Sequence, residues 1–198
     1  YGRRRVGKTE LLRQFCQDKE HIFYTCTEII DEKQLEAFSQ RLLEKNHQAA
    51  KYITHFSDWE QALLSISELA KEKKIVVVID EFPYMVKGNN AIPSILQKLW
   101  DEGLKQSNVM LILCGSAMSF IEKEVLAEKN PLYGRATGIL KMQAMDFYSA
   151  QQFFPNYSME DKITAYAILG GIPHYLKQFS DKYSLDENIV RNILSRGS

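Results

Sequence analysis

Hydrophobic residues occur along this chain either in short continuous runs or at helical spacing in longer amphipathic stretches. Residues 75–79 and 109–114 are continuous runs of apolar side chains. They are shorter than an average helix, and an uninterrupted apolar run is typical of a strand that helices cover on both faces. We expect weaker strands at residues 21–27 and 138–145. The alternation of these runs with amphipathic stretches predicts βα units and a parallel α/β sheet.

Residues that favour helix termini stand beside several amphipathic stretches. Asp31, Ser57 and Ser158 each precede a Gln, Glu or Asp by three positions. This spacing is typical of a helix N-terminus, and the Ser57 segment has the form of a capping box. Pro93 suits the first turn of another helix. Residues 170–171 are both glycine and would end the helix that begins near Ser158.

The first residues of the chain carry a phosphate-binding pattern. The pattern G-x-x-x-x-G-K-[ST] is matched at every fixed position, by Gly2, Gly7, Lys8 and Thr9. Its four variable positions are Arg3, Arg4, Arg5 and Val6. Glycines let the backbone curl so that its N–H groups face phosphates, and a helix N-terminus at the lysine adds positive charge. Lys8 would reach the β- and γ-phosphates, and the Thr9 hydroxyl would ligate Mg²⁺. The alternative is a glycine-rich turn that happens to precede Lys-Thr.

The segment that follows supports the phosphate-binding interpretation. Residues 10–15 form an amphipathic helix start in which Leu11, Leu12 and Phe15 are able to face a sheet. A loop of this type normally follows a buried strand, and no strand precedes Tyr1. We therefore expect the first strand of the core to lie upstream of this sequence.

An acidic pair follows the first buried run directly. Asp80 and Glu81 would lie at the carboxyl end of a parallel strand, where ligands of open α/β sheets bind. Asp80 would hold Mg²⁺, and Glu81 would polarise a water for attack on the γ-phosphate. The alternative is a strand that ends in two solvated acids. The acids are followed by Phe82-Pro83 rather than by the D-x-x-G of switch GTPases, and no N-K-x-D motif occurs, so ATP is favoured over GTP.

Three further residues are candidates for sensing the nucleotide. Ser116 follows the second buried run and would read the γ-phosphate, or alternatively cap a helix, or both. Arg135 lies in a turn-rich segment and would stabilise phosphoryl charge in cis or in trans; the alternative is a surface arginine or a structural ion pair. Pro173 would pack against adenine, or alternatively begin a helix after a glycine stop.

The pattern changes near Asp146, after which helical stretches continue without a convincing strand. We predict an ATPase core over residues 1–145 and a small helical lid domain, expected to be incomplete, over residues 146–198.

Composition excludes several classes of function. The chain has 25 basic and 25 acidic residues among 198, so no global charge draws it to nucleic acid or an anionic membrane. The arginines of the first loop leave a local nucleic-acid contact open. The three cysteines are widely spaced, which argues against a disulfide framework or a structural zinc site and favours a reducing, cytosolic setting. No apolar run approaches the roughly 18 residues that span a bilayer.

Together these motifs resemble the archaeal-type ATP-binding protein family of AAA-like P-loop ATPases, which is related to the signal-transducing STAND class. The resemblance covers nearly the whole chain and rests on residues 1–9, Ile79-Asp80-Glu81, Cys114-Gly115-Ser116, Leu132-Tyr133-Gly134-Arg135 and Gly170-Gly171-Ile172-Pro173-His174-Tyr175-Leu176. It implies a three-layer core of strand order 5-1-4-3-2, a helical lid from which Pro173 contacts the nucleotide, and the use of nucleotide state as a switch. It leaves a protein partner or self-association open.

We therefore predict an Mg-dependent ATPase that acts as a nucleotide-dependent conformational switch. One alternative is a nucleotide-gated interaction scaffold with negligible hydrolysis, in which ATP is a structural ligand. Another alternative is a small-molecule kinase. It would require an arginine-rich lid and an acceptor pocket, and neither is clear in the sequence.

Overall fold

The computed structural model describes residues 1–71 and 73–195, and these residues form two compact units. The first unit comprises Tyr1 and Thr9–Leu140, and the second comprises Gly2–Lys8 and the described residues from Lys141 onward. Each unit has a hydrophobic core of its own. The predicted division at residues 145 and 146 stays a prediction.

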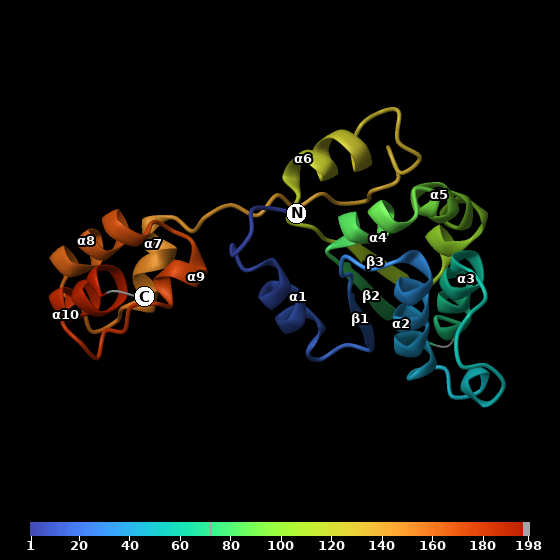
Figure 1. The fold of residues 1–198 in the computed structure, drawn as a ribbon, viewed down its shortest axis with the longest axis horizontal. Helices are drawn as coiled ribbons and strands as arrows, with labels where there is room; N and C mark the ends of the chain where they lie inside the picture. The colour runs from blue at the N-terminus through green and yellow to red at the C-terminus, as the bar shows by residue number, and fades with distance from the viewer. Residues whose placement is uncertain (72, 196–198) are drawn as a thin grey trace. The chain divides into compact units, whose positions relative to one another are not determined.

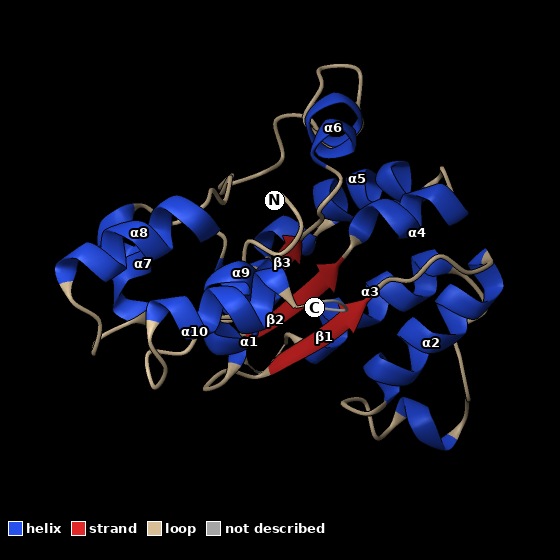
Figure 2. Cartoon of the chain, turned by 60° about the vertical axis from the view of Figure 1, so that its left-hand side comes forward, coloured by secondary structure: helices blue, strands red, loops and turns tan. Residues whose placement is uncertain are grey.

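A parallel three-stranded sheet forms the centre of the first unit. Its strands are β1 (His21–Thr25), β2 (Ile75–Asp80) and β3 (Val109–Leu113), in the order β1-β2-β3. Figure 2 shows that the three strands run in the same direction. Every residue of the middle strand β2 is buried, as expected for an uninterrupted apolar run. The predicted parallel α/β sheet is confirmed for these three strands, whereas the order 5-1-4-3-2 stays a prediction.

Helices cover both faces of this sheet (Figure 1). Alternate residues Ile75, Val77 and Ile79 point into the larger core. The helices that contribute to this core are α2 (Asp31–Leu43), α3 (Trp59–Leu69), α4 (Phe82–Gly88) and α5 (Ile92–Glu102). Val76 and Val78 point to the opposite face, where they pack with Cys16 of α1 (Lys8–Cys16). A strand alternates its side chains between two faces, so covering both requires apolar residues at every position.

Helix α1 contacts the sheet through one narrow stripe. Leu12 and Cys16, four residues apart and therefore on one helix face, belong to the smaller core. Leu11 and Phe15 form the adjacent stripe and are 45% and 36% exposed. Of the three apolar residues expected to face the sheet, Leu12 alone belongs to this core within the described residues.

Helix termini follow the predicted capping chemistry with two exceptions. Asp31 is the first residue of α2 and not its cap, because Ile30 holds the N-cap position without a side-chain hydrogen bond. Helix α5 has Pro93 in its first turn, as predicted. The capping box at Ser57 is wrong, because α3 begins one residue later than that motif requires. Asp58 is the N-cap, and its Oδ1 accepts a hydrogen bond of 2.8 Å from the Gln61 N–H. The Ser57 hydroxyl instead donates a 3.0 Å hydrogen bond to Asp58 Oδ2.

The strand expected at residues 138–145 is also wrong. Within the described residues this segment contains only an isolated parallel bridge, between Met142 and Gly2. A strand exists only where a ladder of hydrogen bonds continues along a partner, and apolar composition alone does not supply one. Ile139 and Leu140 accordingly remain 61% and 64% exposed.

The short helical segments of the first unit connect the elements above. They are η1 (Ala49–Lys51), η2 (Leu104–Gln106), α6 (Met118–Phe120) and η3 (Ile121–Val125).

The second unit is helical beyond its N-terminal loop. Its helices are α7 (Phe147–Ala150), η4 (Gln151–Phe153), α8 (Met159–Leu169), α9 (Pro173–Leu176), α10 (Leu185–Ile189) and η5 (Val190–Leu194). Their common core contains Ala150, Phe154, Tyr157, Ala165, Leu176 and Phe179. The described residues after 146 contain no strand, in agreement with the sequence pattern.

Both ends of α8 lie where the sequence predicts them. Ser158 caps the helix by accepting a 3.1 Å hydrogen bond from the Asp161 N–H, and Gly170 ends it with φ +64°. Gly171 then approaches Met145 so closely that a Cβ would lie 1.8 Å from the Met145 carbonyl oxygen. Its own carbonyl accepts the Met145 N–H at 2.8 Å, which joins the start of the helical segment to the residues before α9. None of the helices in the described part is long and apolar enough to cross a bilayer.

Candidate nucleotide-binding site

The loop Gly2–Lys8 has the backbone shape that its motif predicts. Arg5 and Gly7 both adopt left-handed backbone angles, with φ +68° and +96°. Alternating left- and right-handed residues turn successive N–H groups toward one concave side, which is the arrangement that cradles phosphates. Helix α1 begins at Lys8, as predicted. Lys8 is 7% exposed, and its Nζ donates a 2.9 Å hydrogen bond to the Arg3 carbonyl of the same loop.

Backbone strain coincides with the two predicted motifs. Among the non-glycine residues that the structure describes, only Arg5 and Glu81 have positive φ. A left-handed conformation costs an L-residue about 1–2 kcal/mol. Strained residues of this kind cluster at functional sites, where the surrounding structure holds them.

The loop contacts the glycine-proline segment of the second unit. A Cβ at Gly7 would lie 3.8 Å from Pro173 Cγ, at the first residue of α9. The Arg5 guanidinium carbon lies 5.8 Å from the centroid of the Tyr175 ring, and Arg5 Nη1 donates a 3.5 Å hydrogen bond to the Tyr175 hydroxyl. The structure thus places Pro173 beside the loop. Tyr175 was not among the predicted site residues, and its only signal was its place in the string from Gly170 to Leu176.

The remaining loop residues differ in their exposure. Gly2 and Val6 are buried, whereas Arg3 and Arg4 are exposed. A loop that binds phosphate through backbone N–H groups needs no particular side chain at the exposed positions.

A hydrogen bond joins the loop motif to the acidic pair. Thr9 Oγ1 donates to Asp80 Oδ2 at 2.7 Å across 71 residues of sequence. Asp80 is 1% exposed, and its Oδ1 accepts the Glu81 N–H at 3.0 Å. A hydroxyl and a carboxylate oxygen at this separation are hard ligands of the kind that Mg²⁺ takes, together with waters and substrate phosphates. The donor set therefore fits Mg²⁺.

Glu81 is held by the residue predicted to sense the γ-phosphate. Its Oε2 accepts hydrogen bonds from the Ser116 hydroxyl at 3.0 Å and from the Ser116 N–H at 3.2 Å. The alternative that Ser116 caps a helix is wrong, because the N-cap of α6 is Ala117. Gly115, just before Ser116, lies so close to Pro83 that a Cβ there would be 2.7 Å from Pro83 Cδ.

The backbone around the acidic pair is fixed by its neighbouring strands. The Cys26 N–H donates to the Asp80 carbonyl, and the Phe82 N–H donates to the Cys114 carbonyl, both at 2.8 Å. Burial, together with the nearby Asp80 charge, raises the pKa of the Cys26 thiol to about 12. This thiol therefore stays protonated and supplies no nucleophile at neutral pH. All three cysteines are buried.

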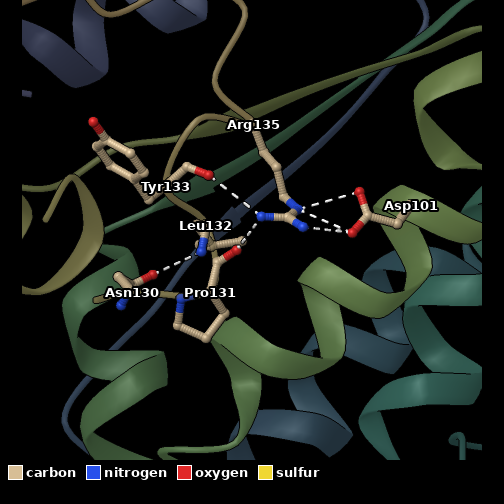
Figure 3. Close-up of polar contacts among 6 residues, drawn as sticks. All are labelled: Asp101, Asn130, Pro131, Leu132, Tyr133 and Arg135. Carbon is tan, nitrogen blue, oxygen red and sulfur yellow. Dashed lines mark hydrogen bonds and ion pairs between the residues drawn. The ribbon is translucent and has the colours of Figure 1, made fainter. Parts of the chain in front are cut away.

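Arg135 makes an ion pair rather than a contact with the acidic pair (Figure 3). Its Nη2 lies 2.6 Å from Asp101 Oδ2, and its Nε donates to both carboxylate oxygens at 3.2 Å. Its Nη1 donates to the carbonyls of Pro131 and Tyr133 at 2.8 and 3.3 Å. Hydrogen bonding from Arg135 lowers the pKa of Asp101. These contacts are those of the structural ion pair that the sequence left open.

Comparisons with known proteins agree with this geometry. A model of the family described as an ATPase domain predominantly from Archaea matches residues 1–179. An uncharacterized protein of Methanocaldococcus jannaschii is 35% identical over 193 residues, which are 96% of this chain and 41% of that protein. A second uncharacterized protein of that archaeon is 45% identical over 47 residues, covering 24% of this chain and 46% of its own length.

A solved structure shares the fold. The Walker-type ATPase PABY2304 of Pyrococcus abyssi matches 96% of this chain and 64% of its own chain, with a TM-score of 0.72 and 21% identity. The chain thus spans less than two thirds of the length of each of these three proteins.

Proposed function

Because the chain belongs to the ATPase domain family that occurs predominantly in Archaea, we propose that it binds Mg-ATP, hydrolyses it, and uses nucleotide state as a conformational switch. The observation that carries this proposal is the 2.7 Å hydrogen bond between Thr9 and Asp80. It joins the phosphate-binding motif to the acidic motif, as a shared metal would require.

The loop residues bind the phosphates. Backbone N–H groups of residues 3–8 face the phosphate oxygens, and the left-handed angles at Arg5 and Gly7 support that curvature. The Lys8 ammonium exchanges the Arg3 carbonyl for the β- and γ-phosphates, which are stronger acceptors because they are charged. Pro173, which lies beside Gly7, contacts the nucleotide from the helical segment.

Thr9 and Asp80 hold the metal. Mg²⁺, when bound, neutralises charge that develops on the phosphate oxygens. The Thr9 hydroxyl and the Asp80 carboxylate would be its protein ligands, and the Glu81 N–H keeps Asp80 in place.

Glu81 is the general base that orients the attacking water. Its backbone is fixed in a left-handed conformation at the end of β2, and Ser116 fixes its carboxylate. The free carboxylate oxygen, Oε1, is the one assigned to water, since Oε2 accepts both hydrogen bonds from Ser116. Ser116 also reads the γ-phosphate, and Arg135 does so if its pair with Asp101 opens.

The alternative is a nucleotide-gated scaffold with negligible hydrolysis. It is favoured by one observation, that Oε2 of Glu81 accepts both Ser116 donors and is thereby withheld from a water. ATP would then stabilise one conformation by mass action and present it to a protein partner or to a second copy of the chain.

The test is phosphate release from Mg-ATP by the wild type, Glu81→Gln and Lys8→Ala, measured beside equilibrium ATP binding. We expect Lys8→Ala to lose binding, and Glu81→Gln to bind ATP while releasing no phosphate. Glu102→Gln, which changes an exposed glutamate of α5, is the matched control. Tight binding without phosphate release in the wild type would favour the scaffold. Normal turnover by Glu81→Gln would remove Glu81 from the role of base.

A further inference from the structure

Arg5 occupies a loop position at which glycine would remove the backbone strain. Its φ of +68° lies in the region that glycine adopts without penalty. The arginine side chain leaves the loop and reaches α9, where the guanidinium lies over the Tyr175 ring and its Nη1 donates to the Tyr175 hydroxyl. The strained backbone thus coincides with a side-chain contact that spans 170 residues of sequence.

We propose that Arg5 and Tyr175 form a link that couples occupancy of the phosphate-binding loop to helix α9. Arg5 is a positioning residue in this proposal, because its guanidinium holds the shape of the loop through Tyr175 instead of contacting phosphate. The proposal rests on the proposed function, since it assumes that the loop Gly2–Lys8 binds ATP.

Helix α9 is anchored so that it responds to the loop. Leu176 is fully buried in the core of the second unit. The N–H groups of Tyr175 and Leu176 both donate to the Ile172 carbonyl, at 2.9 and 3.1 Å. Just before this turn, Gly171 is pressed against Met145 with no room for a side chain. A shift of Arg5 is therefore transmitted to this packed turn instead of being absorbed by a loose segment.

The contact on the Tyr175 side is built from its ring as well as its hydroxyl. Tyr175 is 41% exposed, and its ring also meets the His174 ring edge-on, with centroids 5.6 Å apart. A guanidinium over an aromatic face is stabilised by the ring even where the hydrogen bond is long. Removal of the ring should consequently weaken the link more than removal of the hydroxyl.

A double-mutant cycle on ATP affinity tests the link. We expect Arg5→Ala and Tyr175→Ala each to weaken ATP binding about five-fold, the value for one cation–π contact. If the residues act through each other, the double variant should also lose about five-fold, whereas independent effects would multiply to roughly 25-fold. Tyr175→Phe should lose less than Tyr175→Ala. Lys177→Ala, which removes an exposed charge at the end of α9, is the matched control and should leave affinity within about two-fold.

A further variant of Arg5 separates the effect of its backbone strain from the effect of its side-chain contact with Tyr175. Arg5→Gly removes the side chain and relieves the backbone, so it should melt at a higher temperature than Arg5→Ala while losing the same ATP affinity. Wild-type affinity in Arg5→Gly would overturn the proposal, because it would show that the loop needs only glycine at this position.

Hydrogen exchange distinguishes this link from a purely structural role of Arg5 and Tyr175. A purely structural role would not make the ATP-dependent slowing of amide exchange in α9 depend on these two side chains. Saturating ATP should slow amide exchange at residues 175–177 in the wild type and leave it unchanged in Arg5→Ala and Tyr175→Ala. Equal slowing in all three proteins, or multiplicative losses of affinity, would overturn the link while the proposed function stands. A wild type that does not bind ATP would overturn both.

Discussion

Asp80→Asn should leave the stability of the first unit nearly unchanged while removing its response to Mg²⁺. Asp80 is a carboxylate at 1% exposure, and among the described residues no lysine or arginine pairs with it. Its two recorded hydrogen bonds come from the Thr9 hydroxyl at 2.7 Å and the Glu81 N–H at 3.0 Å. Asparagine preserves both contacts, because its carbonyl accepts the N–H and its amide donates to the hydroxyl oxygen.

The expected change in the free energy of unfolding follows from the buried charge of the Asp80 carboxylate. Burying a carboxylate costs several kcal/mol, which two charge-assisted hydrogen bonds of about 1.5–3 kcal/mol each roughly offset. A buried amide costs about 2 kcal/mol and recovers about 1 kcal/mol from each of two neutral hydrogen bonds. Because both balances come close to zero, we expect the free energy of unfolding of Asp80→Asn to lie within about 1 kcal/mol of the wild-type value. Thr9→Val, which removes a donor and leaves the charge, should be about 2 kcal/mol less stable.

Urea unfolding followed by tryptophan fluorescence measures this difference. Both tryptophans of the chain, Trp59 and Trp100, lie in the first unit, so the signal reports that unit. A change of 1 kcal/mol shifts the midpoint by roughly 0.5 M urea. Mg²⁺ added with ATP should raise the midpoint of the wild type but not of Asp80→Asn. If Asp80→Asn loses about 2 kcal/mol, as Thr9→Val is expected to, the charge is needed for folding and the reasoning fails.

Three further substitutions test separate parts of the molecule. Ser116→Ala removes one hydrogen bond to the Glu81 carboxylate and should lower kcat about ten-fold with KM for ATP unchanged; a raised kcat in steady-state phosphate release would mean that Ser116 restrains Glu81. Gly171→Ala places a Cβ 1.8 Å from a backbone carbonyl oxygen and should cost about 3 kcal/mol, seen as a lower melting temperature by circular dichroism. Hydrogen bonding, first from Lys73, lowers the pKa of Glu20 to about 2, below its unfolded value, so this group stabilises the fold above about pH 4.5 and ceases to do so as the pH falls toward 2. Glu20→Gln should consequently be less stable than the wild type at pH 7, and this difference should shrink as the pH falls from about 4.5 toward 2. A difference in urea midpoints that does not shrink over that range would contradict this assignment.

The helices and strands that depend only on a few adjacent residues could be predicted from the sequence. The apolar run of β2 reports burial on both faces, and Ser158 and Gly170 delimit α8, because capping and left-handed turns depend on a few adjacent residues. The segment 138–145 shows the limit of this reasoning. Its apolar residues have strand propensity, but a strand also needs a partner along its whole length, and Met142 bridges only Gly2.

The sequence by itself determined the loop, the acidic pair and their order along the chain, because phosphate and metal chemistry restrict which residue types can stand at those positions. The tertiary structure alone decided which side chains meet. It brought Ser116 to Glu81, Arg135 to Asp101 and Arg5 to Tyr175. Such contacts join residues 34 to 170 positions apart. A polar side chain in a sequence has many possible partners, and only the packing of the core selects the one within hydrogen-bonding distance.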